Sequence, residues 1–324
     1  MRRRLVPLLI LLSIAPTVAS SAAKKRLTMR DLLSFRLVSQ PALSRDGRRV
    51  AFVVAEADFQ ESRYRTDIWV VETEGGKPRP FTRSQEDESM PRWSPDGRWL
   101  AFLSNRPGRA PEARQEEDEA RRPKNQIWIM PSDGGEAVPL TQAEEGVIAY
   151  EWLPDSRTIL YLTREALPKP ERERRERERK FKFDAVVEEK ERYRREFWTI
   201  EIETRRVTRV FEGDYGIAEF EIAPDGRRIA YATNYTGRVD DGKKFDIWVF
   251  SLEDKRARQL TRRPGGERAP RWSPDGREIA FFGPAACRDP VFAERGVPRP
   301  GRRRRAARGD TSLRSWDRGS PLAS

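Results

Sequence analysis

The chain has 324 residues, of which 37% are hydrophobic and 36% are charged, with one cysteine and no histidine. This length allows one large domain or two smaller ones, and the single cysteine, Cys287, excludes an internal disulfide framework. Because a Ser-His-Asp or Cys-His site uses histidine as its base, neither kind of catalytic site can be built from this chain. Zinc and most other transition-metal sites are also disfavoured, because they use histidine and cysteine side chains as ligands.

The net charge of +12 is concentrated at the two ends of the chain. Residues 1–23 carry +3 and residues 285–324 carry +6, which leaves +3 for residues 24–284. The central region is therefore close to neutral, and the composition gives no reason to expect nucleic acid as a partner.

Residues 1–23 have the pattern of a secretory signal peptide. Three arginines at positions 2–4 precede an apolar run, Leu5–Ala15, which is too short to span a bilayer. Thr17-Val18-Ala19 and Ser20-Ser21-Ala22 both offer small residues at the positions that signal peptidase cleavage requires. We expect an exported protein, periplasmic or extracellular, without a membrane span after cleavage; an uncleaved anchor is the alternative.

Residues 24–40 are predicted to form a lead-in segment with a short helix. Thr28 suits the N-cap position, and Asp31, three residues later, suits its partner in a capping box.

The segment Trp93–Phe102, with the sequence WSPDGRWLAF, predicts a strand, a tight turn and a second strand. Pro95 sets φ for the first central position of a type I turn, and the Asp96 carboxylate can accept hydrogen bonds from nearby N–H groups. Gly97 follows where the chain enters the left-handed region, as in a three-residue hairpin. Because Trp99–Leu103 is apolar on both faces, we expect this strand to be covered on both sides.

This unit occurs five times, and a second strand unit lies between consecutive copies. The turn aspartates of the five copies are spaced 50, 59, 70 and 50 residues apart: Asp46, Asp96, Asp155, Asp225 and Asp275. The second unit is centred on tryptophan, in Asp67–Val71, Gln126–Met130, Phe197–Ile200 and Asp246–Phe250.

Two hairpins per period make a four-stranded blade, and blades repeated around an axis make a β-propeller. We therefore predict an all-β fold, an incomplete propeller of about four and a half antiparallel blades, over residues 41–283. The blades are expected at 41–83, 90–142, 149–212 and 217–262, with a fifth that begins near Ala269 and stops at Gly283. The alternative is a set of coincidental turns in a β-sandwich.

Two charged insertions, 106–124 and 165–196, separate the hairpins of the second and third blades. Opposite charges at three- and four-residue spacing in Glu171–Lys180 can support an exposed helix, a docking arm or a lid. We favour a solvated loop, followed by a strand at Phe183–Val187 that re-enters the blade.

Residues 284–324 are rich in Arg, Gly, Pro, Ala and Ser, with four consecutive arginines at 302–305. We expect a disordered tail or the product of a shifted reading frame. Binding to nucleic acid or anionic lipid is the alternative, which export and the lack of aromatic stacking residues disfavour.

No motif in the sequence identifies a catalytic, cofactor-binding or metal site, and we expect no cofactor. Gly-x-Ser-x-Gly, phosphate-loop and Gly-x-Gly-x-x-Gly patterns are absent from the sequence. The Asp-Gly turns lack the ligand spacing of a calcium loop. Glu116-Glu117 and Glu188-Glu189 lie in the charged insertions, and the repeated tryptophans at 69, 128, 198 and 248 are expected to pack in the core.

The repeats resemble those of a known family. Ser-Pro-Asp-Gly-Arg followed by an Ala-Phe strand, with Asp-Ile-Trp-Val further on, is similar to the propeller repeats of TolB-like proteins and of the prolyl oligopeptidase (S9) family. The opening segment, Leu27–Pro41, resembles the start of the acylaminoacyl-peptidase and dipeptidyl-peptidase branch of S9. In S9 enzymes a seven- or eight-bladed propeller restricts access to a C-terminal α/β-hydrolase domain that carries the triad.

The resemblance implies an exported S9-type propeller region that gates and binds peptides and lacks the hydrolase domain. Such a chain is truncated and inactive alone, so whether it counts as an enzyme is left open. Its partners would be peptides or the missing hydrolase domain. The alternatives are a TolB-like periplasmic module that binds envelope proteins, and a stand-alone scaffold for sugars or peptides.

Overall fold

The computed structural model describes residues 27–107, 124–166, 168–180, 194–212, 216–234, 244–262 and 265–283. The chain divides into two compact units, residues 1–35 and 36–324. The predicted signal peptide, the expected strand at 183–187, the acidic pairs of the insertions, Cys287 and the tail lie outside the described residues.

The described part of the first unit holds one short helix, α1 (Met29–Leu33). Thr28 is its N-cap: its hydroxyl accepts a hydrogen bond from the Asp31 N–H, and the Asp31 carboxylate accepts one from the Thr28 N–H at 2.9 Å. The predicted capping box is confirmed.

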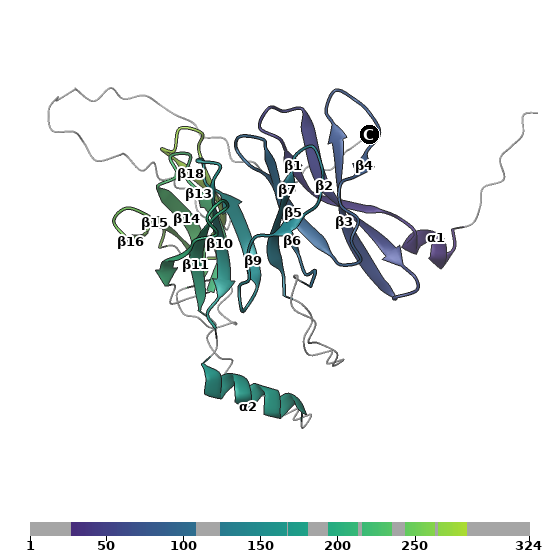
Figure 1. Cartoon of the computed structure of the whole chain (residues 1–324). Helices are drawn as coiled ribbons and strands as arrows, with labels where there is room; N and C mark the ends of the chain where they lie inside the picture. Colours follow the sequence, from purple (N-terminus) through teal and green to yellow (C-terminus); the bar gives the residue numbers. More distant parts are fainter. Residues whose placement is uncertain are drawn as a thin grey trace, which may run out of the picture. The chain divides into compact units, whose positions relative to one another are not determined.

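Within the described ranges, the second unit contains four antiparallel sheets of four strands and one of two strands (Figure 1). The first sheet is β1 (Leu37–Leu43), β2 (Arg49–Asp58), β3 (Arg63–Glu72) and β4 (Arg79–Pro80). The second is β5 (Glu88–Trp93), β6 (Trp99–Ser104), β7 (Gln126–Pro131) and β8 (Val138–Pro139). The third is β9 (Val147–Trp152), β10 (Thr158–Arg164), β11 (Arg195–Glu201) and β12 (Val207–Glu212). The fourth is β13 (Gly216–Ile222), β14 (Arg228–Asn234), β15 (Phe245–Ser251) and β16 (Arg256–Gln259), and the fifth pairs β17 (Arg268–Trp272) with β18 (Ile279–Phe282).

The hairpin between the first two strands of each sheet has the predicted turn. Gly97, with φ of 73°, donates its N–H to the Ser94 carbonyl at 2.8 Å. The Asp96 carboxylate accepts from the Ser94 hydroxyl at 2.6 Å and from the Arg98 N–H at 3.1 Å. In the third sheet Ser156 takes the position of the glycine, with φ of 58°.

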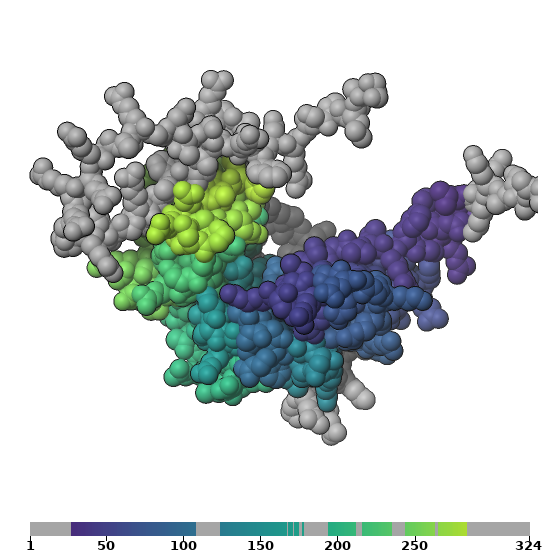
Figure 2. Space-filling model, turned by 90° about the horizontal axis from the view of Figure 1, so that it is seen from above, coloured from purple at the N-terminus to yellow at the C-terminus, as the bar shows by residue number. Residues whose placement is uncertain are grey.

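The hydrophobic cores lie between successive sheets, because the second strand of a sheet buries both of its faces. In β6, Leu100 and Phe102 pack into the core shared with the first sheet, whereas Ala101 and Leu103 pack into the core shared with the third. The expectation of a strand covered on both sides is confirmed. In Figure 2 the colours of the second unit follow one another in chain order, from purple and blue through teal and green to yellow.

Indole hydrogen bonds join the first strands at three of the four junctions between the described sheets. Trp93 Nε1 donates to the Ala42 carbonyl at 3.1 Å, and Trp152 Nε1 donates to the Arg92 carbonyl at 3.2 Å. Trp272 repeats the contact in the fifth sheet at 3.3 Å. Each bond gives a buried indole N–H a partner in the preceding sheet, so the tryptophan fixes the spacing of neighbouring first strands.

The outer strands of three sheets are extended by a threonine hydroxyl. Thr82, Thr141 and Thr261 follow β4, β8 and β16, and each accepts a hydrogen bond at 2.9 Å from the N–H of an isoleucine in the third strand. The hydroxyl therefore replaces a backbone acceptor where the outer strand stops pairing.

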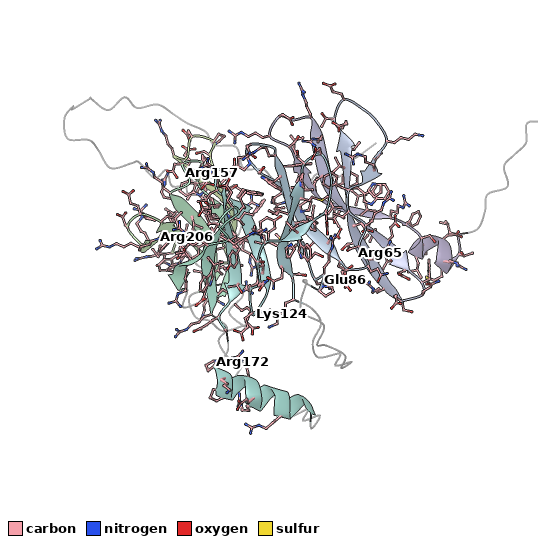
Figure 3. The ribbon with its side chains drawn as sticks, viewed as in Figure 1. Arg65, Glu86, Lys124, Arg157, Arg172 and Arg206 are labelled. Atoms are coloured by element: carbon pink, nitrogen blue, oxygen red, sulfur yellow. The ribbon has the colours of Figure 1, made fainter. Side chains whose placement is uncertain are left out.

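The second insertion contains a helix, α2 (Lys169–Lys180), which agrees with the charge spacing and shows that the favoured loop was wrong for this segment. Arg172 forms an ion pair with Glu144, and Lys124 forms one with Glu145 at 2.8 Å, so two charged side chains meet the turn before β9 (Figure 3). Neither helix in the described part of the chain has the length and apolarity needed to cross a bilayer.

The first prediction concerns the turn glycine. A Cβ at Gly97 would meet no atom within 4 Å, but it would have to adopt a φ near 73°. Gly97→Ala should therefore lower the free energy of unfolding by about 1 kcal/mol, measured by urea denaturation. Gly216→Ala is the matched control, because its Cβ also meets open space and its φ lies outside the left-handed region. Equal losses in the two variants would contradict the conformational explanation.

Candidate functional site

The residues considered in the sequence as candidate ligands have structural roles. The turn aspartates bind their own turns: Ser44 and Arg48 hold the pKa of Asp46 below its usual value, and Asp275 is held in the same way by Ser273 and Arg277. No group of acidic or cysteine side chains able to hold a metal ion occurs in the described ranges.

The repeated tryptophans occupy different surroundings. Trp128 is buried in the core between the first and second sheets, and Trp198 and Trp248 are partly buried against neighbouring cores. Trp69 is partly buried and lines a cavity beside the first sheet. The other three tryptophans therefore pack in or against the hydrophobic cores, whereas Trp69 borders a cavity.

A set of charged side chains occupies one repeat position on four neighbouring first strands. We call it the first-strand row; its members each precede the large apolar residue that ends the strand, namely Arg92 in β5, Glu151 in β9, Glu221 in β13 and Arg271 in β17. The equivalent residue in β1 is Ala42. The row thus reads basic, acidic, acidic, basic along the chain.

Each carboxylate of the row binds the first strand of the following sheet. Glu151 Oε2 accepts a hydrogen bond from the Ile222 N–H at 3.0 Å, and Glu221 Oε2 accepts one from the Trp272 N–H at 2.5 Å. The guanidinium groups stay beside their own strands, since Arg92 and Arg271 each donate to the carbonyl of the preceding proline. The row therefore combines side chains from four sheets, and a backbone N–H or carbonyl group holds each of them in place.

In the first, second and fifth sheets, irregular backbone lies two residues before this repeat position. Gln40, Met90 and Ala269 have φ between 51° and 52°, and each precedes a proline. The pairing of the strand shifts register at each of these bulges. The Gln40 side chain accepts from the Met90 N–H, and the Glu219 side chain accepts from the Ala269 N–H, both at 2.5 Å. Side chains of one sheet thus hold the bulge of the next, which keeps this strained backbone ordered.

The carboxylates of the row are harder to ionise than ordinary glutamates. Burial raises the pKa of Glu151 to about 7; Glu221 raises it further, while the Ile222 N–H, Arg92 and Arg271 oppose the rise. Burial also raises the pKa of Glu221, against hydrogen bonding by Trp272 and the charge of Arg271. Near neutral pH, Glu151 can therefore be present in both protonation states.

The row can bind a polar ligand, but it contains no nucleophile with an adjacent base. Its carboxylates can accept from N–H or ammonium groups, and its guanidinium groups can donate to carbonyl or carboxylate oxygens. Sequence analysis missed the row because the motif search was centred on turns and tryptophans. Aligning the repeats at the residue before the strand-ending apolar position would have revealed it.

The second prediction follows from the pKa of Glu151. Between about pH 4.5 and 7 an unfolded chain releases the proton that folded Glu151 retains, so stability falls as pH rises across this window. Glu151→Gln removes that loss and keeps an acceptor for the Ile222 N–H. The free energy of unfolding of the variant, minus that of the native chain, should therefore be about 2 kcal/mol larger at pH 8 than at pH 5.

The measurement is chemical denaturation at the two pH values. Glu253→Gln, on the exposed turn between β15 and β16, serves as the control and should change stability little at either pH. A Glu151→Gln effect that is the same at pH 5 and pH 8 would show that Glu151 does not titrate in this window.

Comparison with known proteins relates the chain to peptidases. No protein-family model matches it. The chain is 36% identical over 137 residues to the uncharacterized peptidase YuxL of Bacillus subtilis, which covers 42% of this chain and 19% of YuxL. It is 24% identical over 286 residues to dipeptidyl-peptidase 5 of Porphyromonas gingivalis, which covers 82% of this chain and 40% of the relative. The chain thus spans well under half the length of these curated relatives.

Two solved structures show the same fold. The acylaminoacyl peptidase of Pyrococcus horikoshii aligns with a TM-score of 0.53 and 21% identity, covering 76% of this chain and 35% of that one. The putative TolB of Agrobacterium tumefaciens aligns with a TM-score of 0.51 and 18% identity, covering 78% and 73%. The resemblance read from the repeats is confirmed: the chain folds as a β-propeller of the kind shared by TolB-like proteins and S9 peptidases, and its relatives in sequence are peptidases.

Proposed function

We propose that this chain is the propeller region of an S9-type peptidase and that it binds and gates peptide substrates along its first strands. The relatives that match by sequence support the peptidase assignment, because both are named as peptidases. The chain itself has no histidine, so the hydrolytic site would belong to an α/β-hydrolase partner or domain.

The first-strand row is the observation that carries the binding proposal. Propeller blades surround a central channel, and the row lies on neighbouring first strands that are joined to one another by hydrogen bonds. A peptide chain offers N–H donors, carbonyl acceptors and charged termini, and the row offers complementary groups of both signs. A binding module for envelope proteins is the alternative suggested by the TolB-like neighbour, and the peptidase relatives favour the first reading.

The third prediction tests peptide binding. Fluorescein-labelled ten-residue peptides of acidic, basic and neutral composition are titrated into the full chain and followed by anisotropy. At least one class should bind, and the double variant Glu221→Gln/Arg271→Gln should weaken that binding at least tenfold.

The matched control is Arg277→Gln/Glu278→Gln, which removes the same two charges from an exposed hairpin in the fifth sheet. It should bind peptides as the native chain does. If no peptide class binds, or if both double variants bind equally, the row is not a peptide site. The chain alone should hydrolyse none of the peptides.

The fourth prediction concerns export. We infer from the three N-terminal arginines and the apolar run Leu5–Ala15 that the protein is exported and processed near Ala19 or Ala22. Mass spectrometry of the protein expressed in a Gram-negative host should find a mature N-terminus at one of these positions in the periplasmic fraction. An intact Met1 in the cytoplasm would contradict this inference.

A further inference from the structure

The two arginines of the first-strand row keep most of their hydrogen-bond donors free. A guanidinium group carries five N–H donors. Here one Nη1 donor binds the carbonyl of the preceding proline, at 3.0 Å for Arg92 and at 2.9 Å for Arg271. In the part of the chain that the structure describes, neither side chain makes another hydrogen bond or an ion pair. Arg92 is half-buried and Arg271 is exposed, so a ligand that lies along the first strands can reach both.

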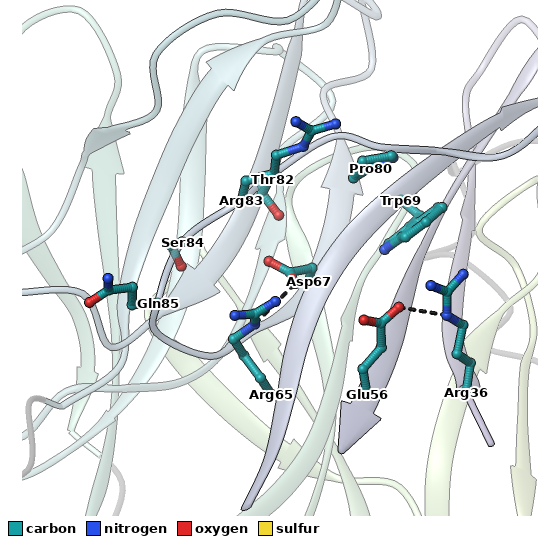
Figure 4. Close-up of a pocket in the computed structure, with 10 residues that line it drawn as sticks. All are labelled: Arg36, Glu56, Arg65, Asp67, Trp69, Pro80, Thr82, Arg83, Ser84 and Gln85. Carbon is teal, nitrogen blue, oxygen red and sulfur yellow. Dashed lines mark ion pairs between the residues drawn. The ribbon is translucent and has the colours of Figure 1, made fainter. Parts of the chain in front are cut away.

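Two arginines beside the first sheet differ from this pair, because each has a carboxylate partner. Arg36 Nε lies 2.6 Å from Glu56 Oε1, and Arg65 Nε lies 3.4 Å from Asp67 Oδ2 (Figure 4). An added anion would have to compete with these carboxylates. These two guanidinium groups are therefore occupied, whereas those of the row are not.

The carboxylates of the row do not neutralise its arginines. Glu151 and Glu221 each bind a backbone N–H group of the following sheet instead. Burial raises the pKa of Glu151, and the charges of Arg92 and Arg271 both oppose that rise, so both guanidinium groups lie near this side chain. Because Glu151 is protonated in part near neutral pH, the four side chains of the row together carry a net positive charge. An anionic ligand group would offset this charge, whereas a cationic group would add to it.

The inference drawn from these contacts rests on the proposed function, in which the first strands bind peptides. We propose that the first-strand row selects peptides that carry a carboxylate, with the guanidinium groups of Arg92 and Arg271 as its donors. A guanidinium group and a carboxylate form charge-assisted hydrogen bonds, which are stronger than hydrogen bonds between neutral groups. The carboxylate belongs to an aspartate or glutamate side chain or to the C-terminus of the peptide, since both present the same two oxygens.

The test is a fluorescence anisotropy titration of the full chain with three ten-residue peptides that carry the same N-terminal fluorescein label. The reference peptide has only neutral residues and an amidated C-terminus. The second peptide replaces one central glutamine of the reference by glutamate, and the third has a free C-terminal carboxylate. At least one of these two carboxylate peptides should bind at least tenfold more tightly than the reference, and the peptide that does so identifies the source of the carboxylate.

Substitutions in the row should remove this preference without removing the peptide site. Arg92→Gln and Arg271→Gln should each reduce the preference at least threefold, and the double variant should abolish it, while all three bind the reference peptide as the native chain does. Arg277→Gln is the matched control, because it removes a guanidinium group from an exposed turn, where its Nε lies 3.8 Å from Asp275. It should keep the full preference. Thermal unfolding of each variant confirms that the chains compared are folded.

The possible failures separate this inference from the proposed function. The inference is overturned if the reference binds as tightly as both carboxylate peptides, if the same peptide with a central lysine binds more tightly than either, or if the double variant keeps the preference. In the first two cases, weaker binding by Glu221→Gln/Arg271→Gln would still support a peptide site on the row. If no peptide binds, the inference and the proposed function are both wrong.

Discussion

The fold depends on one packing constraint, the burial of both faces of the second strand in a sheet. Alternate residues of β6 serve different cores, so no sheet can form its core without the sheets beside it. The consequence is visible at β1, where Leu37, Val38 and Leu43 are 56–65% exposed. Leu43 stands at the repeat position of Trp93, whose indole is covered by the first sheet. Stability in such an array is a property of neighbouring pairs.

The same constraint places polar groups where they can bind ligands. Inter-sheet contacts require the first strands to approach closely. The bulges at Met90 and Ala269 release backbone N–H groups from strand pairing, and these N–H groups donate hydrogen bonds to side chains of the preceding sheet. Glu151 and Glu221 are bound in the same manner, one residue before the end of their strands. The first-strand row is thus a product of the sheet junctions, and its raised carboxylate pKa values follow from burial there.

Equivalent positions in different sheets can have different hydrogen-bond partners. Asp246 and Asp67 share a place in their sheets, yet one is satisfied by Gln259 and the other borders a cavity. Burial raises the pKa of Asp246 to about 6, and Glu267 adds to the rise, whereas Gln259 and Arg262 oppose it. Because the backbone is nearly constant between repeats, an unsatisfied atom at one copy marks a local departure from the pattern.

The sequence by itself determined the sheets, their order and the turns that join their strands, because these depend on local rules. Alternation of apolar residues has a period of two, and Gly97 meets a requirement on a single φ angle. It also determined the capping box at Thr28, a contact across three residues. For residues 169–180 the favoured loop was wrong, since the charge pairs that permit a helix there stabilise an exposed helix only weakly and did not decide between the two.

Only the tertiary structure decided which polar side chains meet. The members of the first-strand row are separated by 50 to 70 residues along the chain, and each has an unremarkable neighbourhood in the sequence. The cavity at Asp67 needs Trp69 and Pro80 on paired strands and Glu56 on a third strand, an arrangement that follows from strand register. Local patterns specify backbone conformation, whereas a binding site requires side chains from distant segments to converge, and that convergence arises from packing between sheets.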